Sequence, residues 1–396
     1  MKKILFLTGT RADFGKLKKL MRFVEGRADM ELHVAVTGMH MLKLYGATYL
    51  EVRREQFEHV YLFSNQYAGE PMSSVLGNTV SMLSRLVDEV QPDLIVVHGD
   101  RIEALAGATV GALTGILVCH IEGGELSGTV DDLIRHSVTK LSHLHMVANE
   151  EARTRLIQMG EDAHHIYIIG SPDLDAMSAA DLPSLCDAKA RYNVGFDAYA
   201  LAIFHPVTTE RSHIQDYARW FFEALSRSGD RYIVIYPNND LGSQEILDTL
   251  HGYRNCDRFR IFPSIRFEYF LTFLKHALYI VGNSSAGVRE APFYGVPAVN
   301  VGTRQHRRSR IGAIVSTDYR IEAILEGIDK VKHLKRCAPS AWFGDGDSVR
   351  KFKQAITTDS FWRTPVQKSF VDFAKPLAAP AYHANLMHQT MLQDSA

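Results

Sequence analysis

The sequence has few cysteines and no excess of charge of either sign. Its four cysteines (Cys119, Cys186, Cys256 and Cys337) lie far apart and form no CxxC pair. This spacing argues against a zinc site and a disulfide framework, and it fits a reducing compartment. Lysine and arginine number 44 against 45 aspartate and glutamate, so the formal charge is −1. We therefore expect no general attraction to nucleic acid or to an anionic membrane.

Long apolar runs are also missing. No stretch approaches the roughly 20 residues that a membrane span needs. The apolar run Ile4–Leu7 is too short for a signal peptide, and the polar segment Thr8–Asp13 follows at once, which indicates a buried first strand. We expect a cytoplasmic protein with no membrane span. At 396 residues, 46% of them hydrophobic, the chain is long enough for two domains.

Short β-branched apolar runs alternate with helical patterns in the first half of the chain. The clearest helical stretch is Val75–Val90, where apolar residues recur at intervals of three and four. Alternation of this kind predicts a parallel, doubly wound sheet. The predicted strands are Ile4–Leu7, Leu32–Thr37, Leu94–His98, Leu117–Ile121, His145–Val147 and Ile166–Ile169.

The pattern loosens over Ser171–Ala190, where we place a linker, and then restarts. We therefore predict an α/β protein of two Rossmann-like domains, residues 1–175 and 190–375, with a peripheral tail over 376–396. The second set of predicted strands is Ala200–Phe204, Tyr232–Tyr236, Arg260–Phe262, Tyr279–Val281 and Ala298–Val301. The predicted helices among them lie near Ile214–Ser226, Gln244–Leu250, Phe267–His276 and Ser285–Phe293.

Three carboxylates follow strands of the predicted first domain. Asp100 and Glu122 come directly after apolar strands, and Asp131 opens a helix nine residues further on. Ligands bind at the carboxyl ends of parallel strands, so these acids should share a cleft and perturb one another's proton affinity. Asp100 or Asp131 could instead cap the helix that follows it. A third alternative is a divalent metal held by all three acids. The cap role of Asp131, together with two other ways of supplying positive charge, argues against it.

Other strand ends offer groups for an anionic ligand. The segment Gly9–Gly15 is a glycine turn that opens a helix and carries Arg11, although it is neither GxGxxG nor a P-loop. His205 and Asn238 each follow a strand of the second half, and Arg101 follows Asp100. An ordinary turn with a solvated arginine, or a structural histidine, would explain each feature taken alone.

The segment Gly282–Pro292 is the most specific of these. It passes from a strand into a predicted helix begun by Ser284 and Ser285, whose hydroxyl and N–H groups could seat a phosphate. Glu290 follows about one and a half turns later, near enough to accept hydrogen bonds from ribose hydroxyls. The alternative is a capped helix with a solvated acid. Arg304, after the last predicted strand, supplies a further guanidinium.

Taken in order, these segments resemble the hydrolysing UDP-N-acetylglucosamine 2-epimerases of sialic acid biosynthesis. The resemblance covers most of the chain and implies two Rossmann-like domains with a ligand cleft between them, the GT-B-like architecture of one large class of glycosyltransferases. The motifs that carry it are TGTRADFGKL from Thr8, VTGMHM from Val36, HGDR from His98, HIEGGE from His120, GTVDDLIRHSVTKLSH from Gly128, FHPVT from Phe204, YPNND from Tyr236, GNSSAGVREAP from Gly282 and GTRQ from Gly302.

The resemblance also implies roles for individual residues. Asp100, Glu122 and Asp131 match the family's catalytic acids, and His205 is placed to stabilise charge on the leaving diphosphate. It implies no metal, no nicotinamide and no other cofactor. The residues implied to contact UDP are Arg11, Arg101, His205, Asn238, Ser284, Ser285, Glu290 and Arg304, together with Gly15 and Ile265 through their backbone.

The implied reaction converts UDP-N-acetylglucosamine and water to N-acetylmannosamine and UDP. The N-acetylmannosamine would supply sialic acid synthesis for a capsule or surface polysaccharide. The hydrogen on sugar C2 is too weakly acidic for an unaided carboxylate. Departure of UDP must therefore precede or accompany its removal, which gives 2-acetamidoglucal as the intermediate to be hydrated. Which carboxylate acts as base and which as acid is left open. We expect a homodimer, which is common for such folds.

Several alternatives share the UDP-sugar site. One is a hydrolysing epimerase for UDP-2,4-diacetamido-2,4,6-trideoxyglucose, as in legionaminic acid synthesis. Another is a non-hydrolysing epimerase that releases UDP-N-acetylmannosamine. A glycosyltransferase of the same architecture would need an acceptor and would not need three carboxylates at one strand edge. A non-catalytic binding module would bind UDP and turn nothing over.

Overall fold

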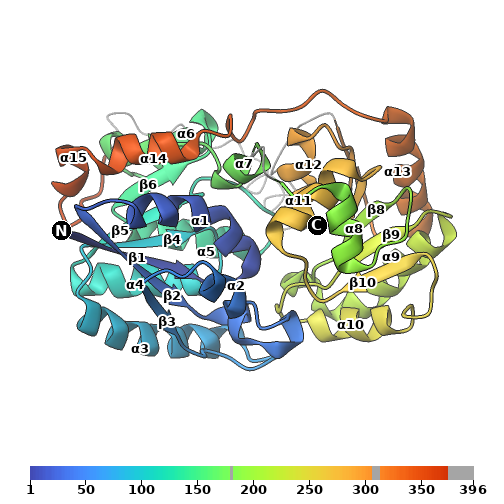
Figure 1. Ribbon diagram of the computed structural model, residues 1–396, viewed down its shortest axis with the longest axis horizontal. Coiled ribbons are helices and arrows are strands. Elements are labelled where there is room, and N and C mark those ends of the chain that lie inside the picture. Colours follow the sequence, from blue (N-terminus) through green and yellow to red (C-terminus); the bar gives the residue numbers. More distant parts are fainter. Residues whose placement is uncertain (179–181, 306–312, 373–396) are drawn as a thin grey trace, which may run out of the picture.

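The computed structural model describes residues 1–178, 182–305 and 313–372, which form two α/β domains side by side (Figure 1). The first domain has a seven-stranded sheet in the order β3-β2-β1-β4-β5-β6-β7, and neighbouring strands run parallel. Its strands are β1 (Lys2–Thr8), β2 (Met30–Val36), β3 (His59–Leu62), β4 (Leu94–His98), β5 (Leu117–Ile121), β6 (Leu144–Val147) and β7 (Ile166–Ile168).

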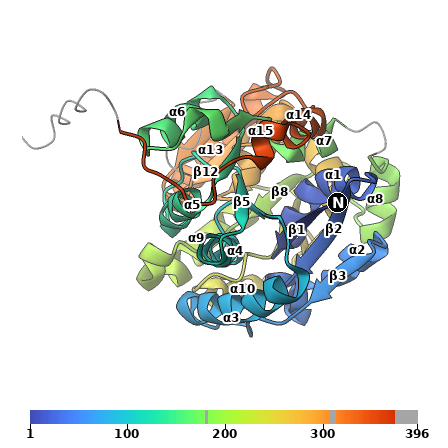
Figure 2. The same cartoon turned by 90° about the vertical axis from the view of Figure 1, so that its left-hand side faces the viewer.

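Helices cover both faces of this sheet (Figure 2). One face packs against α1 (Arg11–Glu25), α14 (Ser348–Ile356) and α15 (Asp359–Trp362). The other packs against α3 (Met72–Val90), α4 (Ile102–Thr114) and α5 (Val130–Leu141). The remaining helices of this part of the chain are α2 (Tyr49–Arg54), α6 (Glu150–Gln158) and α7 (Pro172–Met177).

The second domain repeats the plan with a six-stranded parallel sheet in the order β10-β9-β8-β11-β12-β13. None of the described helices is both long and apolar enough to cross a membrane. The strands are β8 (Ala200–Ile203), β9 (Tyr232–Ile235), β10 (Phe259–Phe262), β11 (Ile280–Gly282), β12 (Ala298–Val301) and β13 (Ile314–Thr317). The helices are α8 (Leu185–Tyr192), α9 (Ile214–Arg227), α10 (Ser243–His251), α11 (Phe267–His276), α12 (Glu290–Phe293) and α13 (Ile321–Leu334).

The predicted doubly wound architecture is confirmed, and each predicted strand is present within one or two residues. Two strands, β3 and β13, were not predicted. Both lie at the edge of their sheet and are only half-buried, so they lack the continuous apolar run that marks a strand covered on both faces.

The end of the described chain returns to the first domain. The aromatic side chains of Phe352 and Phe361, on α14 and α15, are fully buried in the same core as Ile4 and Phe14. The sequence-based division had placed residues 348–372 in the second domain, because a helix's own periodicity does not show which sheet it covers. The predicted tail, 376–396, lies outside the described residues.

The chain passes between the two domains twice, near Ser171 and near Phe343. These two connecting segments, the crossings, lie against each other. Ser171 N–H donates to the carbonyl of Phe343 at 2.7 Å. A Cβ added to Gly344 would lie 2.9 Å from the Cα of Gly170, so both glycines are needed for this close approach. The linker expected over Ser171–Ala190 is therefore one of a pair of adjacent crossings, and α7 occupies its start.

Replacing Phe361 tests whether α15 is part of the first domain. Its side chain is 0% exposed. We expect Phe361→Ala to lower the free energy of unfolding by about 3–5 kcal/mol, because the lost ring leaves a cavity. Chemical denaturation measures the change. Tyr67→Ala, at an aromatic side chain that is 64% exposed, is the control. A change as small as the control's would show that α15 does not pack there.

Candidate active site

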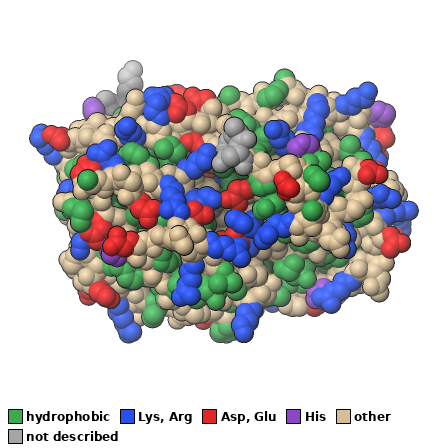
Figure 3. All heavy atoms as spheres, viewed as in Figure 1, with side chains coloured by type: hydrophobic (Ala, Val, Ile, Leu, Met, Phe, Trp, Pro, Cys, Tyr) green, Lys and Arg blue, Asp and Glu red, His purple; other side chains and the backbone are tan. Residues whose placement is uncertain are grey.

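A cavity of about 300 Å³ lies between the two domains, at the carboxyl ends of both sets of strands. This size is at the lower end for small-molecule sites. Basic and acidic side chains both gather along the seam between the domains (Figure 3). The first domain contributes Thr10, Arg11, Asp13, Lys16, His98, Asp100, Arg101, Glu122 and Asp131, and the second contributes His205, Asn238, Ile265, Ser284, Ser285, Glu290 and Arg304.

The cavity collects all the candidate residues from the sequence except Gly15. A Cβ at Gly15 would lie 2.6 Å from the ring of Phe267 on α11. This glycine is explained by the close packing of α1 on the second domain. The backbone contact with UDP that the resemblance implies for Gly15 stays a prediction.

A reciprocal cap fixes the start of α1 at the cavity wall. Thr10 Oγ1 accepts a hydrogen bond from Asp13 N–H at 3.1 Å, and Asp13 Oδ2 accepts one from Gly9 N–H at 3.1 Å. Each side chain satisfies an N–H group that the helix leaves free. Arg11, the first residue of α1, is thereby held where its guanidinium lines the cavity.

Neither Asp100 nor Asp131 caps a helix. Thr129 Oγ1 accepts from Asp131 N–H at 3.2 Å and so caps α5, while α4 begins without a side-chain cap. Asp100 instead pairs with Arg135, and Asp131 pairs with Arg304 of the second domain at 3.1 Å. The capping explanations considered from the sequence are therefore wrong, and both carboxylates face the cavity.

The surroundings of Asp131 raise the pKa of its carboxyl group. Its burial, together with the nearby negative charges of Asp100 and Asp240, raises its pKa, against the opposing effect of Arg304. A raised pKa favours the role of proton donor over that of base.

Glu122 is in the opposite state. It follows β5 with a left-handed backbone (φ 74°), an unfavourable conformation for a residue with a side chain. Burial opposes its ionisation, yet Arg289, Lys16 and His98 together lower its pKa well below the usual range. His98 Nε2 lies 2.9 Å from Glu122 Oε2, and Lys16 Nζ lies 3.9 Å away. The surroundings thus shift the pKa values of Glu122 and Asp131 in opposite directions, as the separate roles of base and acid require.

His98 is a functional candidate that the sequence analysis missed. Its Nδ1 is 3.0 Å from Asp13, and its Nε2 faces Glu122. Burial disfavours the charged ring, but Glu122 and Asp13 raise its pKa to about 9, so His98 is an imidazolium at neutral pH. It is the last residue of β4, so the rule that ligands meet strand ends could have identified it.

His205 is neutral and oriented. Its Nδ1 accepts from Asn238 N–H at 2.9 Å, so the proton of the neutral ring is on Nε2. Asn283 holds the backbone of His205 from both sides, at 2.6 and 2.8 Å. Burial first, then Arg304 and Arg101, lower the ring's pKa well below its usual value. His205 can therefore donate a hydrogen bond into the cavity without carrying charge.

Comparison with known proteins decides the family. A family model described as UDP-N-acetylglucosamine 2-epimerase matches residues 22–357. The chain belongs to this family. It is 56% identical over 375 residues to the UDP-N-acetylglucosamine 2-epimerase of Neisseria meningitidis serogroup B, covering 94% of this chain and 99% of that one. The family resemblance predicted from the motifs is confirmed.

Other relatives of this 2-epimerase family are more distant. The hydrolyzing UDP-N,N'-diacetylbacillosamine 2-epimerase of Legionella pneumophila is 32% identical, with 90% of this chain and 96% of that one covered. The polysialic acid biosynthesis protein P7 of Escherichia coli is 30% identical, with coverage of 83% and 86%. A crystal structure of a Neisseria meningitidis UDP-GlcNAc 2-epimerase bound to UDP-GlcNAc has a TM-score of 0.75 at 16% identity, covering 89% and 99%, and shares the fold.

One predicted helix of this epimerase is wrong. Ser285–Phe293 is a 3₁₀ turn (Ser285–Gly287), a break, and then the short α12. A continuous helix would need an N–H at Pro292 to bond the carbonyl of Val288, and proline has none. The phosphate-binding site predicted at Ser284 and Ser285 therefore lacks a helix dipole. Only the local hydroxyl and N–H groups remain to bind a phosphate. Ser284 Oγ accepts from Ala286 N–H at 3.3 Å.

Two arginines predicted to bind UDP are paired across the domain boundary. Arg101, from the first domain, donates to Asn239 at 2.6 Å and pairs with Asp240 at 3.3 Å. Arg304, from the second, pairs with Asp131 of the first. Both line the cavity, so they join the domains at its wall and can also meet an anionic ligand.

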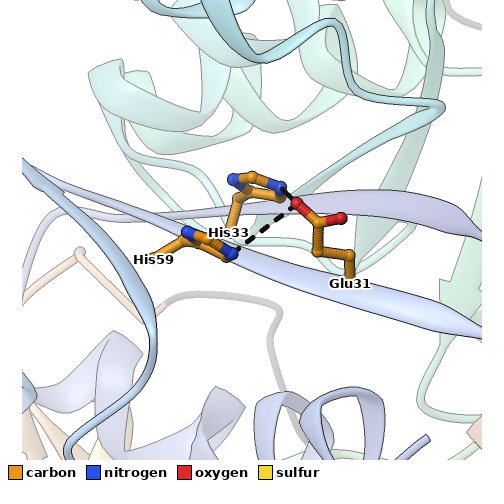
Figure 4. Close-up of side chains that lie close together, drawn as sticks. All are labelled: Glu31, His33 and His59. Atoms are coloured by element: carbon orange, nitrogen blue, oxygen red, sulfur yellow. Dashed lines mark hydrogen bonds and ion pairs between the residues drawn. The ribbon is translucent and has the colours of Figure 1, made fainter. Parts of the chain in front are cut away.

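Asp100, Glu122 and Asp131 do not form a metal site in the described part of the epimerase. Each pairs with a different arginine, and they are not among the described groups whose ligand atoms all lie within 4.8 Å. Glu31, His33 and His59 do meet that distance, on the neighbouring strands β2 and β3 (Figure 4). The two rings stack with 14° between their planes, and Nε2 of each faces the same oxygen of Glu31 (Figure 4). Glu31 accepts from His33 Nε2 at 2.7 Å, which accounts for the cluster without an ion.

Proposed function

We propose that this epimerase is of the hydrolysing type and converts UDP-N-acetylglucosamine and water to N-acetylmannosamine and UDP. Among its relatives, the 56% identical protein is named for UDP-N-acetylglucosamine, the 32% identical one is named as hydrolyzing, and the 30% identical one is named for polysialic acid biosynthesis. The product would supply sialic acid synthesis. The observation that carries the proposed chemistry is that Glu122 and Asp131 line one cavity with pKa values shifted in opposite directions.

In the first step the bond between C1 and the UDP oxygen breaks and its electron pair leaves with UDP. The C2 proton passes to a carboxylate, for which we assign the ionised Glu122, and a double bond forms between C1 and C2. Charge grows on the leaving diphosphate, so donors already in place lower the barrier. Arg11, neutral His205 and the Ser284–Ser285 hydroxyls line the cavity where such donors are needed.

In the second step water adds to C1 of the unsaturated sugar and a proton returns to C2. Protonation from the opposite face inverts C2, so the proton donor must be a group other than the first acceptor. We assign Asp131, because its raised pKa makes it the better proton donor of the two acids. One O–H bond of water breaks as its oxygen bonds to C1. Of that proton and the one taken up by Glu122, one restores Asp131 and the other passes to solvent, so one water is consumed and free UDP and N-acetylmannosamine are released.

Isotope incorporation tests this route. In heavy water the N-acetylmannosamine formed should carry one deuterium at C2, because the returning proton comes from a group that exchanges with solvent. Mass spectrometry and proton NMR of the product measure it. Incubating the enzyme with unlabelled N-acetylmannosamine in heavy water controls for later exchange. Product that fully retains the original hydrogen would exclude elimination.

The relatives also favour one alternative substrate. The Legionella pneumophila relative is named for UDP-N,N'-diacetylbacillosamine, a sugar that carries a 4-acetamido group. A panel with both UDP-sugars, scored by free UDP, separates the two specificities. Release of UDP-N-acetylmannosamine in place of UDP would instead indicate a non-hydrolysing epimerase.

We further propose a cytoplasmic homodimer. Leu113 on α4 and Leu133 on the neighbouring α5 are 81% and 70% exposed, and such side chains suit a contact with a second copy. Sedimentation of the purified protein measures the oligomeric state.

A further inference from the structure

Arg289 is a buried arginine that crosses from the second domain into the first. It lies between the 3₁₀ turn and α12 and is 1% exposed. Its guanidinium contacts Glu122 and donates to both oxygens of Glu125, at 3.0 and 3.1 Å. Arg289 belongs to the segment Gly282–Pro292, which also carries Ser284, Ser285 and Glu290.

The guanidinium is held on several sides. Arg289 Nη2 contacts the hydroxyl of Ser171 and lies 3.6 Å from Asp173, and the ring of Phe343 lies 5.0 Å from the guanidinium carbon. A planar group with donors in fixed directions, fastened at several points, has little freedom to turn. The same N–H edge of the guanidinium therefore stays directed at Glu122.

Arg289 does not line the cavity, although its chain neighbours Ser284, Ser285 and Glu290 do. The segment thus has two sides, one facing the ligand space and the other reaching behind Glu122. A residue in this position can act on a substrate only through the carboxylate that it holds.

We propose that Arg289 is a positioning residue for the epimerase reaction, fixing the Glu122 carboxylate from the opposite domain in the orientation needed for proton transfer. This inference rests on the proposed role of Glu122. Close pairing makes a carboxylate a weaker base, and what it provides in return is an ionised group that needs no reorientation when the substrate arrives.

The other charges around Glu122 are accounted for. Burial opposes its ionisation, and among the charges that lower its pKa Arg289 has the largest effect, followed by Lys16 and His98. Further charged groups among the described residues that face it or its partners are Asp13 on α1, Arg135 on α5, Asp173 on α7, Glu125 in the same loop and Glu290 on α12. Without Arg289, the carboxylate loses its strongest cationic partner, so its pKa should rise.

The test compares Arg289→Met and Arg289→Lys with the wild type, and Arg153→Lys is the matched control. Arg153 lies at the surface of α6, paired with Glu150 at 3.0 Å. We expect kcat to fall tenfold or more in Arg289→Met, with UDP affinity by calorimetry within a factor of about three. The acidic limb of the kcat profile should move to higher pH, because Glu122 is then protonated more readily. Arg289→Lys should have a higher kcat than Arg289→Met, because lysine returns the positive charge but not the planar set of N–H donors.

Ser171→Ala covers the case in which Arg289→Met does not fold. It removes one anchor of the guanidinium and leaves Glu122 and its charges in place, so kcat should fall several-fold with UDP binding unchanged. If the folded variants bind UDP and keep the wild-type kcat and pH profile, the inference is wrong. If the wild type itself releases no UDP and incorporates no deuterium, the proposed function fails instead, whatever Arg289 does.

Discussion

Glu122→Gln should lower kcat by about 10²–10⁴-fold, the usual contribution of a positioned general acid or base, while UDP binding changes little. Glutamine keeps the shape of the side chain but cannot accept a proton at neutral pH. Glu122 is also the residue that Arg289, His98 and Lys16 converge on. Steady-state kinetics with UDP-N-acetylglucosamine and calorimetry with UDP measure the two quantities separately.

The matched control is Glu150→Gln, at a surface side chain that is 66% exposed. It makes the same chemical change far from the cavity and should leave both quantities as in the wild type. Equal loss of turnover and of UDP affinity in Glu122→Gln would make Glu122 a structural residue. Loss of turnover alone places it in the chemical step.

Replacing His205 by alanine should reduce kcat by about 10²–10³-fold, the cost of one preorganised donor to a developing anion. The ring is buried and neutral, with its proton on Nε2, so it provides a hydrogen bond that strengthens as charge grows on the diphosphate. The loss should therefore appear more in kcat than in affinity for UDP. Kinetics and UDP titration of the variant measure both.

His164→Ala is the control, because that ring is 90% exposed on the surface. A second check uses pH. Since burial and two arginines already keep His205 neutral, the pH profile of the wild type should show no limb from its titration. A His205→Ala variant that turns over normally would remove this ring from the reaction.

The sequence predicted the fold where strands are covered on both faces. β4 and β5 are continuous apolar runs and were located to the residue, whereas the half-exposed edge strands β3 and β13 carry no such signal. The final helices were assigned to the wrong domain because the partner of α14 lies more than 300 residues earlier in the chain. Long-range packing of this kind is not encoded in any local pattern.

The residues of the site could be predicted where they directly follow a strand of either sheet. Asp100, Glu122 and His205 each follow a strand, and that position alone brought them to the cavity. Lys16 and Arg289 could not be found this way. Lys16 lies in the middle of α1, and Arg289 matters because of Glu122 and Glu125, which lie on the other domain. Such residues show their role only once both halves of the chain are folded together.

The double crossing between the domains has a consequence for dissecting the protein. A fragment ending near residue 175 would contain every strand of the first sheet yet lack Phe352, Ile356 and Phe361. The apolar surface of α1 that these residues cover would then be exposed to solvent. Shortening the chain from its carboxyl end would likewise damage the amino-terminal half first. To produce the two domains as separate proteins, the segment 348–372 would have to be joined directly to the first domain.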